Sequence, residues 1–122
     1  MNKFTTKEIG NKGEDYAVDF LLKNEYKILN RNYHSKFGEI DIIAENKEYL
    51  IFVEVKTRHK DSLTLPYEAV DKSKQRKIIK TAKYFLMKNP TEKYCRFDVC
   101  EVFTDKATLG LSRINYIENA FE

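Results

Sequence analysis

Hydrophobic residues recur at helical spacing near the start of the chain. They form a stripe at intervals of three and four residues, made up of Ala17, Val18, Leu21 and Leu22. Thr5 or Thr6 can cap this segment, since a threonine hydroxyl accepts a hydrogen bond from the first free backbone N–H groups of a helix. The pattern therefore predicts a helix that runs to about Asn24.

A second helical segment is predicted in the middle of the chain. It opens at Pro66, and Asp71 marks a candidate break within it. Its apolar stripe consists of Ile78, Ile79, Ala82, Phe85 and Leu86. The Asn89-Pro90 pair ends the segment, because the residue before a proline disfavours helical backbone.

Five other segments have the composition and alternation of β-strands. They are Tyr26–Tyr33, Glu39–Glu45, Glu48–Thr57, Arg96–Phe103 and Leu111–Ile117. The third contains the densest β-forming run of the chain, residues 49–53, and should be the central strand. Asn46-Lys47 predicts the turn of a hairpin between the second and third strands.

The order of these elements predicts an α/β fold. One helix, three strands, a helix and two strands give a mixed five-stranded sheet flanked by helices. No internal repeat, low-complexity tract or Pro/Gly-rich linker divides the sequence, and 122 residues is the length of one ordinary domain. We therefore expect residues 1–122 to form a single domain.

The composition of the chain predicts the cellular compartment in which the protein works. The N-terminal residues contain no apolar run typical of a signal peptide, and no apolar stretch approaches the roughly 18 residues of a membrane span. Cys95 and Cys100 would point to opposite faces of one strand, and their spacing fits neither a disulfide framework nor a zinc hairpin. We expect a cytoplasmic protein with reduced thiols and no membrane partner.

Positive charge is concentrated in the second half of the chain. The net charge of +3 is small, but residues 56–96 contain twelve lysines and arginines against four aspartates and glutamates. Such a basic segment favours a polyanionic partner, although a lysine-rich face that only contacts solvent is the simpler explanation for any single lysine.

Three ionisable residues fall in the most hydrophobic part of the predicted sheet. Asp41 lies on the second strand, where alternation places it on one face with Glu39 and places Ile40 and Ile42 on the other. Glu54 and Lys56 share one face of the third strand. Charged groups are costly there unless they are paired or bind a metal ion.

These residues allow two interpretations. Lys56 could form a structural salt bridge with either carboxylate at a strand end. Alternatively, the hairpin brings Asp41 and Glu54 together, and two carboxylates with one lysine are what a hard cation neutralises. Asp41, Glu54 and the Val55 carbonyl would then bind Mg²⁺ or Mn²⁺, which activates a water for phosphodiester hydrolysis. Lys56 would orient that water or stabilise the developing negative charge.

Glu14 is a further candidate on the first helix. It precedes Ala17, Val18 and Leu21 by three, four and seven residues, so it shares their stripe and faces the sheet. The alternative is an acidic residue favoured by the helix dipole near its N-terminus, an explanation that suits Asp15 better than Glu14.

The spacing of Asp41, Glu54 and Lys56 resembles the PD-(D/E)xK nuclease superfamily, which has the restriction-endonuclease-like fold. A longer set of motifs resembles the bacterial YraN-like family of predicted endonucleases. These motifs are Gly13-Glu14-Asp15-x-Ala17, Ile28-Leu29-x-Arg31-Asn32, residues 38–44, residues 52–58, Pro66-x-Glu68-Ala69-Val70-x3-Lys74, Arg96-Phe97-Asp98-Val99 and Asn119-Ala120-Phe121. That family is similar to the archaeal Holliday junction resolvases in fold and in its expected active-site residues.

The resemblance implies a catalytic set on this chain. Its members would be Glu14, Asp41, Glu54 and Lys56, with Lys74 as a basic helix residue nearby. Two departures from the family pattern lie outside this set: Glu25 stands where glycine is usual and Cys100 where an aliphatic residue is usual. Junction resolvases act as symmetric dimers, which leaves a homodimer open for this chain.

The basic residues around the site are candidates for contact with nucleic acid. They are Arg58, Lys60, Lys74 and Lys77, of which the first two directly follow the third strand. No recognition helix or other base-reading motif is visible, so contact should be with the phosphate backbone and carry little sequence specificity. Tyr16, Tyr33 and Tyr67 could stack on unpaired bases, although packing within the protein is the default role of a tyrosine.

The sequence therefore supports one main hypothesis and two rivals. The main hypothesis is a metal-dependent nuclease that hydrolyses DNA phosphodiester bonds, with branched DNA as one candidate substrate. The first rival is a catalytically silent nucleic-acid-binding module on the same fold. The second is an interaction protein whose partner binds the edge of the sheet.

Overall fold

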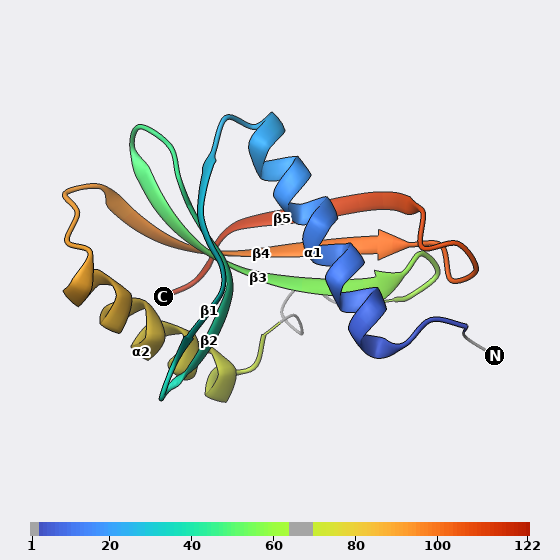
Figure 1. Cartoon of the computed structure of the whole chain (residues 1–122), viewed down its shortest axis with the longest axis horizontal. Helices are drawn as coiled ribbons and strands as arrows, with labels where there is room; N and C mark the ends of the chain where they lie inside the picture. Colours follow the sequence, from blue (N-terminus) through green and yellow to red (C-terminus); the bar gives the residue numbers. More distant parts are fainter. Residues whose placement is uncertain (1–2, 64–69) are drawn as a thin grey trace.

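The computed structural model describes residues 3–63 and 70–122 (Figure 1). Helix α1, Thr6–Lys23, begins as predicted after Thr5, whose hydroxyl accepts a hydrogen bond from the Glu8 N–H. The Glu8 carboxylate accepts in turn from the Thr5 N–H at 2.9 Å. This reciprocal pair satisfies two backbone donors that a helix start leaves free.

Helix α2, Lys72–Lys88, begins at the position where the sequence predicted a break. Asp71 is its N-cap, and the Asp71 carboxylate accepts from the Lys74 N–H at 2.8 Å. The helix ends at Asn89, before Pro90, as predicted. The predicted helical start at Pro66 and the stacking candidate Tyr67 lie outside the described residues.

The five strands form one mixed sheet. Their bounds are β1 Lys27–Ser35, β2 Gly38–Glu45, β3 Tyr49–His59, β4 Tyr94–Thr104 and β5 Leu111–Phe121. They follow sequence order across the sheet, and β3 and β4 are parallel while the other neighbours are antiparallel. The predicted α/β class and the central position of the third strand are confirmed. The last strand runs four residues further than predicted, to Phe121.

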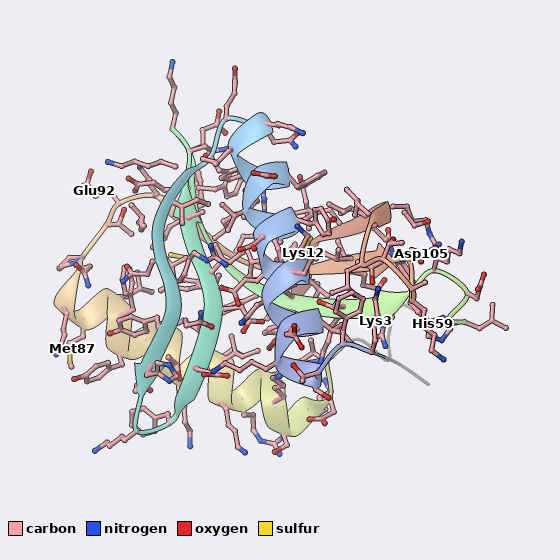
Figure 2. All side chains as sticks on the ribbon, turned by 45° about the vertical axis from the view of Figure 1, so that its right-hand side comes forward. Lys3, Lys12, His59, Met87, Glu92 and Asp105 are labelled. Atoms are coloured by element: carbon pink, nitrogen blue, oxygen red, sulfur yellow. The ribbon has the colours of Figure 1, made fainter. Side chains whose placement is uncertain are left out.

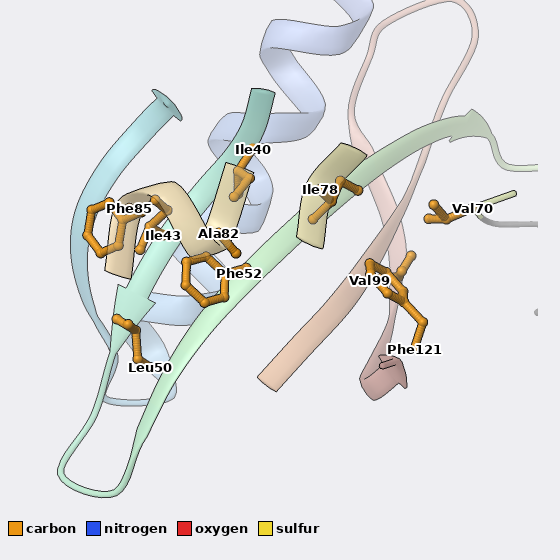
Figure 3. Packing of buried hydrophobic residues seen from close by; sticks show 10 residues of the cluster. All are labelled: Ile40, Ile43, Leu50, Phe52, Val70, Ile78, Ala82, Phe85, Val99 and Phe121. Carbon is orange, nitrogen blue, oxygen red and sulfur yellow. The ribbon is translucent and has the colours of Figure 1, made fainter. Parts of the chain in front are cut away.

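The helices pack on opposite faces of the sheet. On β3, Ile51 and Val53 belong to a core cluster with Ala17 and Leu21 of α1. The intervening Phe52 belongs to a second cluster, which contains Ile78, Ala82 and Phe85 of α2 (Figure 3). Alternate side chains of a strand point to opposite faces, so this division makes α1 and α2 the two outer layers of a sandwich.

The alternation predicted for β2 is wrong at one position. Ile40 lies in the α2 cluster and Ile42 in the α1 cluster, although residues two apart on a regular strand share a face. Two irregularities coincide here. The ladder between β2 and β3 ends at Ile42, and Asn32, which lies opposite Asp41 on β1, has a positive φ of 53°. Regular pairing is therefore lost at Asp41.

A buried polar network around Asp98 ties β4 to β5. Asp98 is fully buried and accepts two hydrogen bonds of 2.9 Å from the Arg96 guanidinium. It also accepts from the Tyr116 hydroxyl at 2.6 Å and from the Asn119 N–H at 2.9 Å. A buried carboxylate with four donors is fully compensated, so we assign this network a structural role.

The two cysteines are not joined in a disulfide. Cys95 is exposed and Cys100 is buried, and both thiols are free, as predicted. Neither of the two described helices is long and apolar enough to cross a membrane.

Close approach of α1 to the sheet depends on a glycine. A Cβ at Gly13 would overlap the Thr57 side chain on β3, whereas a Cβ at Gly10, one turn earlier in the same helix, would meet no atom within 4 Å. Gly13 thus allows α1 to lie directly on β3, and it immediately precedes the buried residue Glu14.

These two glycines give a matched test. Gly13→Ala should lower the free energy of unfolding by about 1–3 kcal/mol, because the methyl group overpacks the helix–strand contact. Gly10→Ala should raise it by up to about 1 kcal/mol, because alanine is the better helix former at an open position. Urea unfolding of both variants measures the difference. Equal stability of the two would show that α1 does not need this close contact.

Candidate active site

The site begins where strands β2 and β3 separate. The last paired residues are Ile42 and Val53, and Asp41 is the first residue of β2 beyond the ladder. Its carboxylate accepts a hydrogen bond of 2.8 Å from the Val55 N–H of β3. A side chain therefore takes the place of a strand partner, which fixes the Asp41 carboxylate between the two strands.

Glu54 lies against this carboxylate. It is only 6% exposed, and its carboxyl group lies within hydrogen-bonding reach of Asp41. Burial, together with the nearby Glu54, raises the pKa of Asp41 to about 7, although the Val55 N–H and the Lys74 ammonium act in the opposite direction. Two carboxylates this close resist carrying two negative charges.

Two lysines lie beside the carboxylate pair and differ in their contacts. The Lys74 ammonium of α2 forms an ion pair of 3.2 Å with Glu54. Burial lowers the pKa of Lys74, but Glu54, with the charges of Asp41 and Glu39, outweighs that effect, so the pKa is raised. Lys56 is half-buried, and none of the ion pairs within residues 3–63 and 70–122 includes it. Burial and the charge of Lys74 lower the pKa of Lys56.

Glu14 lies on helix α1, on the face of the sheet opposite to α2 and Lys74. It is 7% exposed, and one of its oxygens accepts from the Arg31 guanidinium at 3.0 Å and from the Asn32 amide at 3.1 Å. Burial raises the pKa of Glu14, and the negative charge of nearby Asp41 adds to that effect, while Arg31 opposes it. Glu14 thus faces the sheet as predicted.

Asn32 belongs to one of the family motifs, but its sequence context predicts no role for it at the site. Its φ of 53° lies in the left-handed region, which asparagine tolerates better than most residues. This conformation accompanies the break in alternation opposite Asp41, and the Asn32 amide donates to Glu14. No periodicity or spacing in the sequence signals a left-handed residue inside a strand.

Two cavities lie near the carboxylate pair: Asp41 lines one of them, and Lys74, which pairs with Glu54, lines the other. The α1-side cavity has a volume of about 310 Å³, and its lining includes Glu14, Asp41, Val55 and Lys56. The α2-side cavity has a volume of about 350 Å³, and its lining includes Glu39, Lys74 and Lys77. Glu39, predicted to share a face with Asp41, therefore lies in the neighbouring cavity instead.

Of the remaining predicted contacts with nucleic acid, Arg58 and Lys60 line neither cavity, whereas Lys77 lines the α2-side cavity. Arg58 forms an ion pair of 3.2 Å with the buried Glu101, and Lys60 forms one of 3.1 Å with Asp105. Arg58 is therefore largely committed to a partner inside the protein, and Lys60, which is half-exposed, remains accessible. Lys77 is exposed on α2.

The donor set for a metal ion is small. Across the described parts of the chain, no three His, Cys, Asp or Glu residues are close enough together to hold a metal ion. Asp41 and Glu54 provide two adjacent carboxylates, and Val55 lines the same cavity as Asp41. Mg²⁺ is commonly bound through one or two carboxylates, with water and substrate phosphate as the other ligands, so this set fits such an ion.

Comparison with known proteins gives a family match. The model of "Uncharacterised protein family UPF0102" matches residues 13–102. A UPF0102 protein of Caldanaerobacter subterraneus is 44% identical over 99% of this chain and 100% of its own length. A UPF0102 protein of Fusobacterium nucleatum is 48% identical over 83% of this chain and 86% of its own length. A UPF0102 protein of Caldicellulosiruptor saccharolyticus is 46% identical over 99% of this chain and 100% of its own length.

Among solved structures, SfsA of Pyrococcus furiosus in complex with Ca²⁺ matches with a TM-score of 0.31 and 14% sequence identity. The match covers 86% of this chain and 62% of that chain. A TM-score this low does not establish a shared fold.

The raised pKa of Asp41 predicts a pH-dependent stability. The folded state holds this proton more tightly than the unfolded chain, so the stability gained from it is lost as pH rises from about 4 to about 7. In EDTA, Asp41→Asn should be more stable than the unsubstituted protein at pH 8, by about 1–3 kcal/mol, and the difference should shrink towards pH 4.5. Urea unfolding at several pH values measures it.

Asp19→Asn is the matched control, since it removes one carboxylate at an exposed position of α1. If Asp41→Asn and Asp19→Asn shift stability equally at every pH, Asp41 is not destabilised by its neighbours.

Proposed function

This chain belongs to the UPF0102 family, which is the YraN-like family that its motifs resemble, and we propose that it is a metal-dependent endonuclease acting on DNA. The observation that carries the proposal is the contact between Asp41 and Glu54 beside Lys56. Burial with a charged neighbour perturbs the pKa of both Asp41 and Lys56, and perturbed groups that line one cavity are typical of catalytic sites.

A cation would relieve the repulsion between the two carboxylates. Asp41 and Glu54 would hold Mg²⁺ or Mn²⁺, with the Val55 carbonyl as a further donor. The bound ion would supply Lewis-acid polarisation of a phosphate oxygen and lower the pKa of a bound water. Lys74 already lies against Glu54, so the ion would share this carboxylate with the ammonium group.

Lys56 has the position and the freedom for a catalytic role. It lines the α1-side cavity with Asp41, and no ion pair within the described residues holds its ammonium elsewhere. In the proposed reaction it stabilises the negative charge that develops on the phosphate, or it orients the attacking water.

Glu14 supports the site from α1. Through its hydrogen bonds it fixes the Arg31 guanidinium and the Asn32 amide beside Asp41. Arg31 also forms an ion pair of 2.9 Å with Asp15, and its side chain is 41% exposed, which leaves its remaining N–H groups open to a substrate phosphate. In this proposal Glu14 acts by positioning these groups.

The substrate class follows from charge. Helix α2 contains six lysines and one arginine and no acidic residue, and it borders the α2-side cavity next to Glu54. Lysines without a base-reading motif bind the phosphate backbone, so we expect little sequence specificity and strong dependence on salt. Branched DNA is the candidate substrate that the family resemblance adds.

The alternative function is a nucleic-acid-binding module without catalysis. The ion pair between Lys74 and Glu54 favours it, because it neutralises one carboxylate without any metal. The two proposals make opposite predictions about cleavage.

A cleavage assay separates them. Linear duplex, single-stranded, flap and four-way junction DNA are incubated with Mg²⁺ or Mn²⁺. The protein should cut at least one of these substrates, and Asp41→Ala and Lys56→Ala should each reduce the rate by at least about 100-fold, because each removes charge from the reacting centre. Asp19→Ala, which removes an exposed carboxylate of α1, should leave the rate unchanged.

Each variant is checked for folding by circular dichroism. If the folded protein binds DNA and never cuts it, the binding-module proposal replaces this one. If Asp41→Ala cuts at the normal rate, the catalytic site is assigned to the wrong residues.

A further inference from the structure

The tip of the β1–β2 hairpin forms a cavity with the outer side of α2. This hairpin-tip cavity has a volume of about 470 Å³ and is lined by Lys36, Phe37, Lys80, Lys83, Tyr84 and Met87. Three of these side chains are large and apolar or aromatic, and the other three are lysines. None is acidic.

The hairpin tip is fixed against α2. The hydroxyls of Ser35 and Thr81 are hydrogen-bonded at 3.1 Å, and the Phe37 N–H donates to the Ser35 hydroxyl at 3.1 Å. Thr81 is fully buried. Gly38 follows with a φ of 153°, and a Cβ there would lie 3.4 Å from the Lys77 Cβ. Phe37 is therefore presented from a tip that α2 holds in place.

The ring of Phe37 is 38% exposed and Met87 is 70% exposed. Figure 2 shows Met87 and His59 at opposite ends of the molecule, so this surface is distinct from the one around Arg58 and Lys60. Apolar side chains grouped at an exposed cavity mark a binding surface more often than isolated ones do.

Positive charge surrounds the aromatic rings. The Lys36 ammonium lies 5.3 Å from the centre of the Phe37 ring, and the Lys88 ammonium lies 4.8 Å from the centre of the Tyr84 ring. Lys80 and Lys83 line the same cavity. A protein partner with an apolar surface would bring no charge to balance these lysines, whereas a nucleic acid strand brings one phosphate for each base.

We propose that the hairpin-tip cavity binds unpaired nucleotides of a DNA strand, with bases stacked on Phe37 and Tyr84 and phosphates contacted by Lys80 and Lys83. Aromatic rings interspersed with cations are the common means of binding single strands without reading their sequence. Because it assigns a substrate feature to the same nuclease, this inference rests on the proposed function.

The location connects the cavity to the candidate active site. Phe37 adjoins Gly38, which lines the α2-side cavity with Lys74 and Lys77. Lys74 in turn pairs with Glu54. A strand held at the hairpin tip can thus follow α2 to the carboxylates, which assigns the protein to substrates with a single-stranded segment, such as flaps.

The test measures DNA binding without cleavage. Fluorescence anisotropy in EDTA compares the affinity for single-stranded and for fully duplex DNA. Phe37→Ala should weaken binding of the single strand by about fivefold or more, as expected for loss of one base–aromatic stack, and should change duplex binding by less than about twofold. Phe37→Trp should restore the affinity for the single strand.

Two controls match these changes. Tyr94→Ala removes an aromatic ring that is 73% exposed on β4 and should leave both affinities unchanged. Lys83→Glu should weaken binding of the single strand, whereas Lys23→Glu, the same charge change at the end of α1, should weaken it much less.

The outcomes separate this inference from the proposed function. If Phe37→Ala weakens binding of the single strand selectively and the protein never cuts DNA, the inference stands and the nuclease proposal fails. If the protein cuts DNA and Phe37→Ala binds the single strand normally, or loses both affinities equally, the inference fails. Dimerisation of the protein that Phe37→Ala abolishes, with DNA binding intact, would also overturn it.

Discussion

The candidate active site depends on two carboxylates held close together, the buried Glu54 and the half-buried Asp41. Asp41 and Glu54 belong to neighbouring strands, and burial together with the nearby Glu54 raises the pKa of Asp41 to about 7. Such a pair costs folding free energy unless positive charge or a proton compensates it. The surrounding structure supplies compensation only in part: the Val55 N–H binds Asp41 and the Lys74 ammonium binds Glu54. A site with this imbalance is suited to a cation and to a negatively charged substrate.

The fold creates this contact by interrupting its own regularity. If β2 continued to pair with β3, Asp41 would lie in the ladder, and Ile40 and Ile42 would share a face. Instead the ladder ends at Ile42, and the positive φ of Asn32 accompanies the change on β1. Gly13 then allows α1 to approach Thr57 closely, which brings Glu14 near Asp41, from the α1 face of the sheet. Strain and close packing thus converge at one point of the sheet, as is common at functional sites.

The helices, the strands and their order in the sheet could largely be predicted from the sequence, because local patterns of residue types determine them. The cap of α1 and the central position of β3 both follow from residue types at short spacing. The placement of Ile40 could not be predicted, since period-2 alternation assumes a regular strand. The pairing of Arg58 with Glu101 joins residues 43 positions apart, and the sequence alone does not specify such a contact. The cavity at Phe37 likewise exists only because the hairpin tip folds back onto α2.

Direct titration with Mn²⁺, followed by the loss of its free electron paramagnetic resonance signal, measures whether a cation binds at the two carboxylates. The folded protein should bind Mn²⁺ at one site, and Asp41→Asn should weaken that binding by about tenfold or more, since it removes a charged ligand. Lys56→Ala should bind Mn²⁺ at least as tightly as the unsubstituted protein, because it removes a competing positive charge from the same cavity. Equal Mn²⁺ binding by the unsubstituted protein and Asp41→Asn, or no binding by either, would contradict a cation site at the two carboxylates.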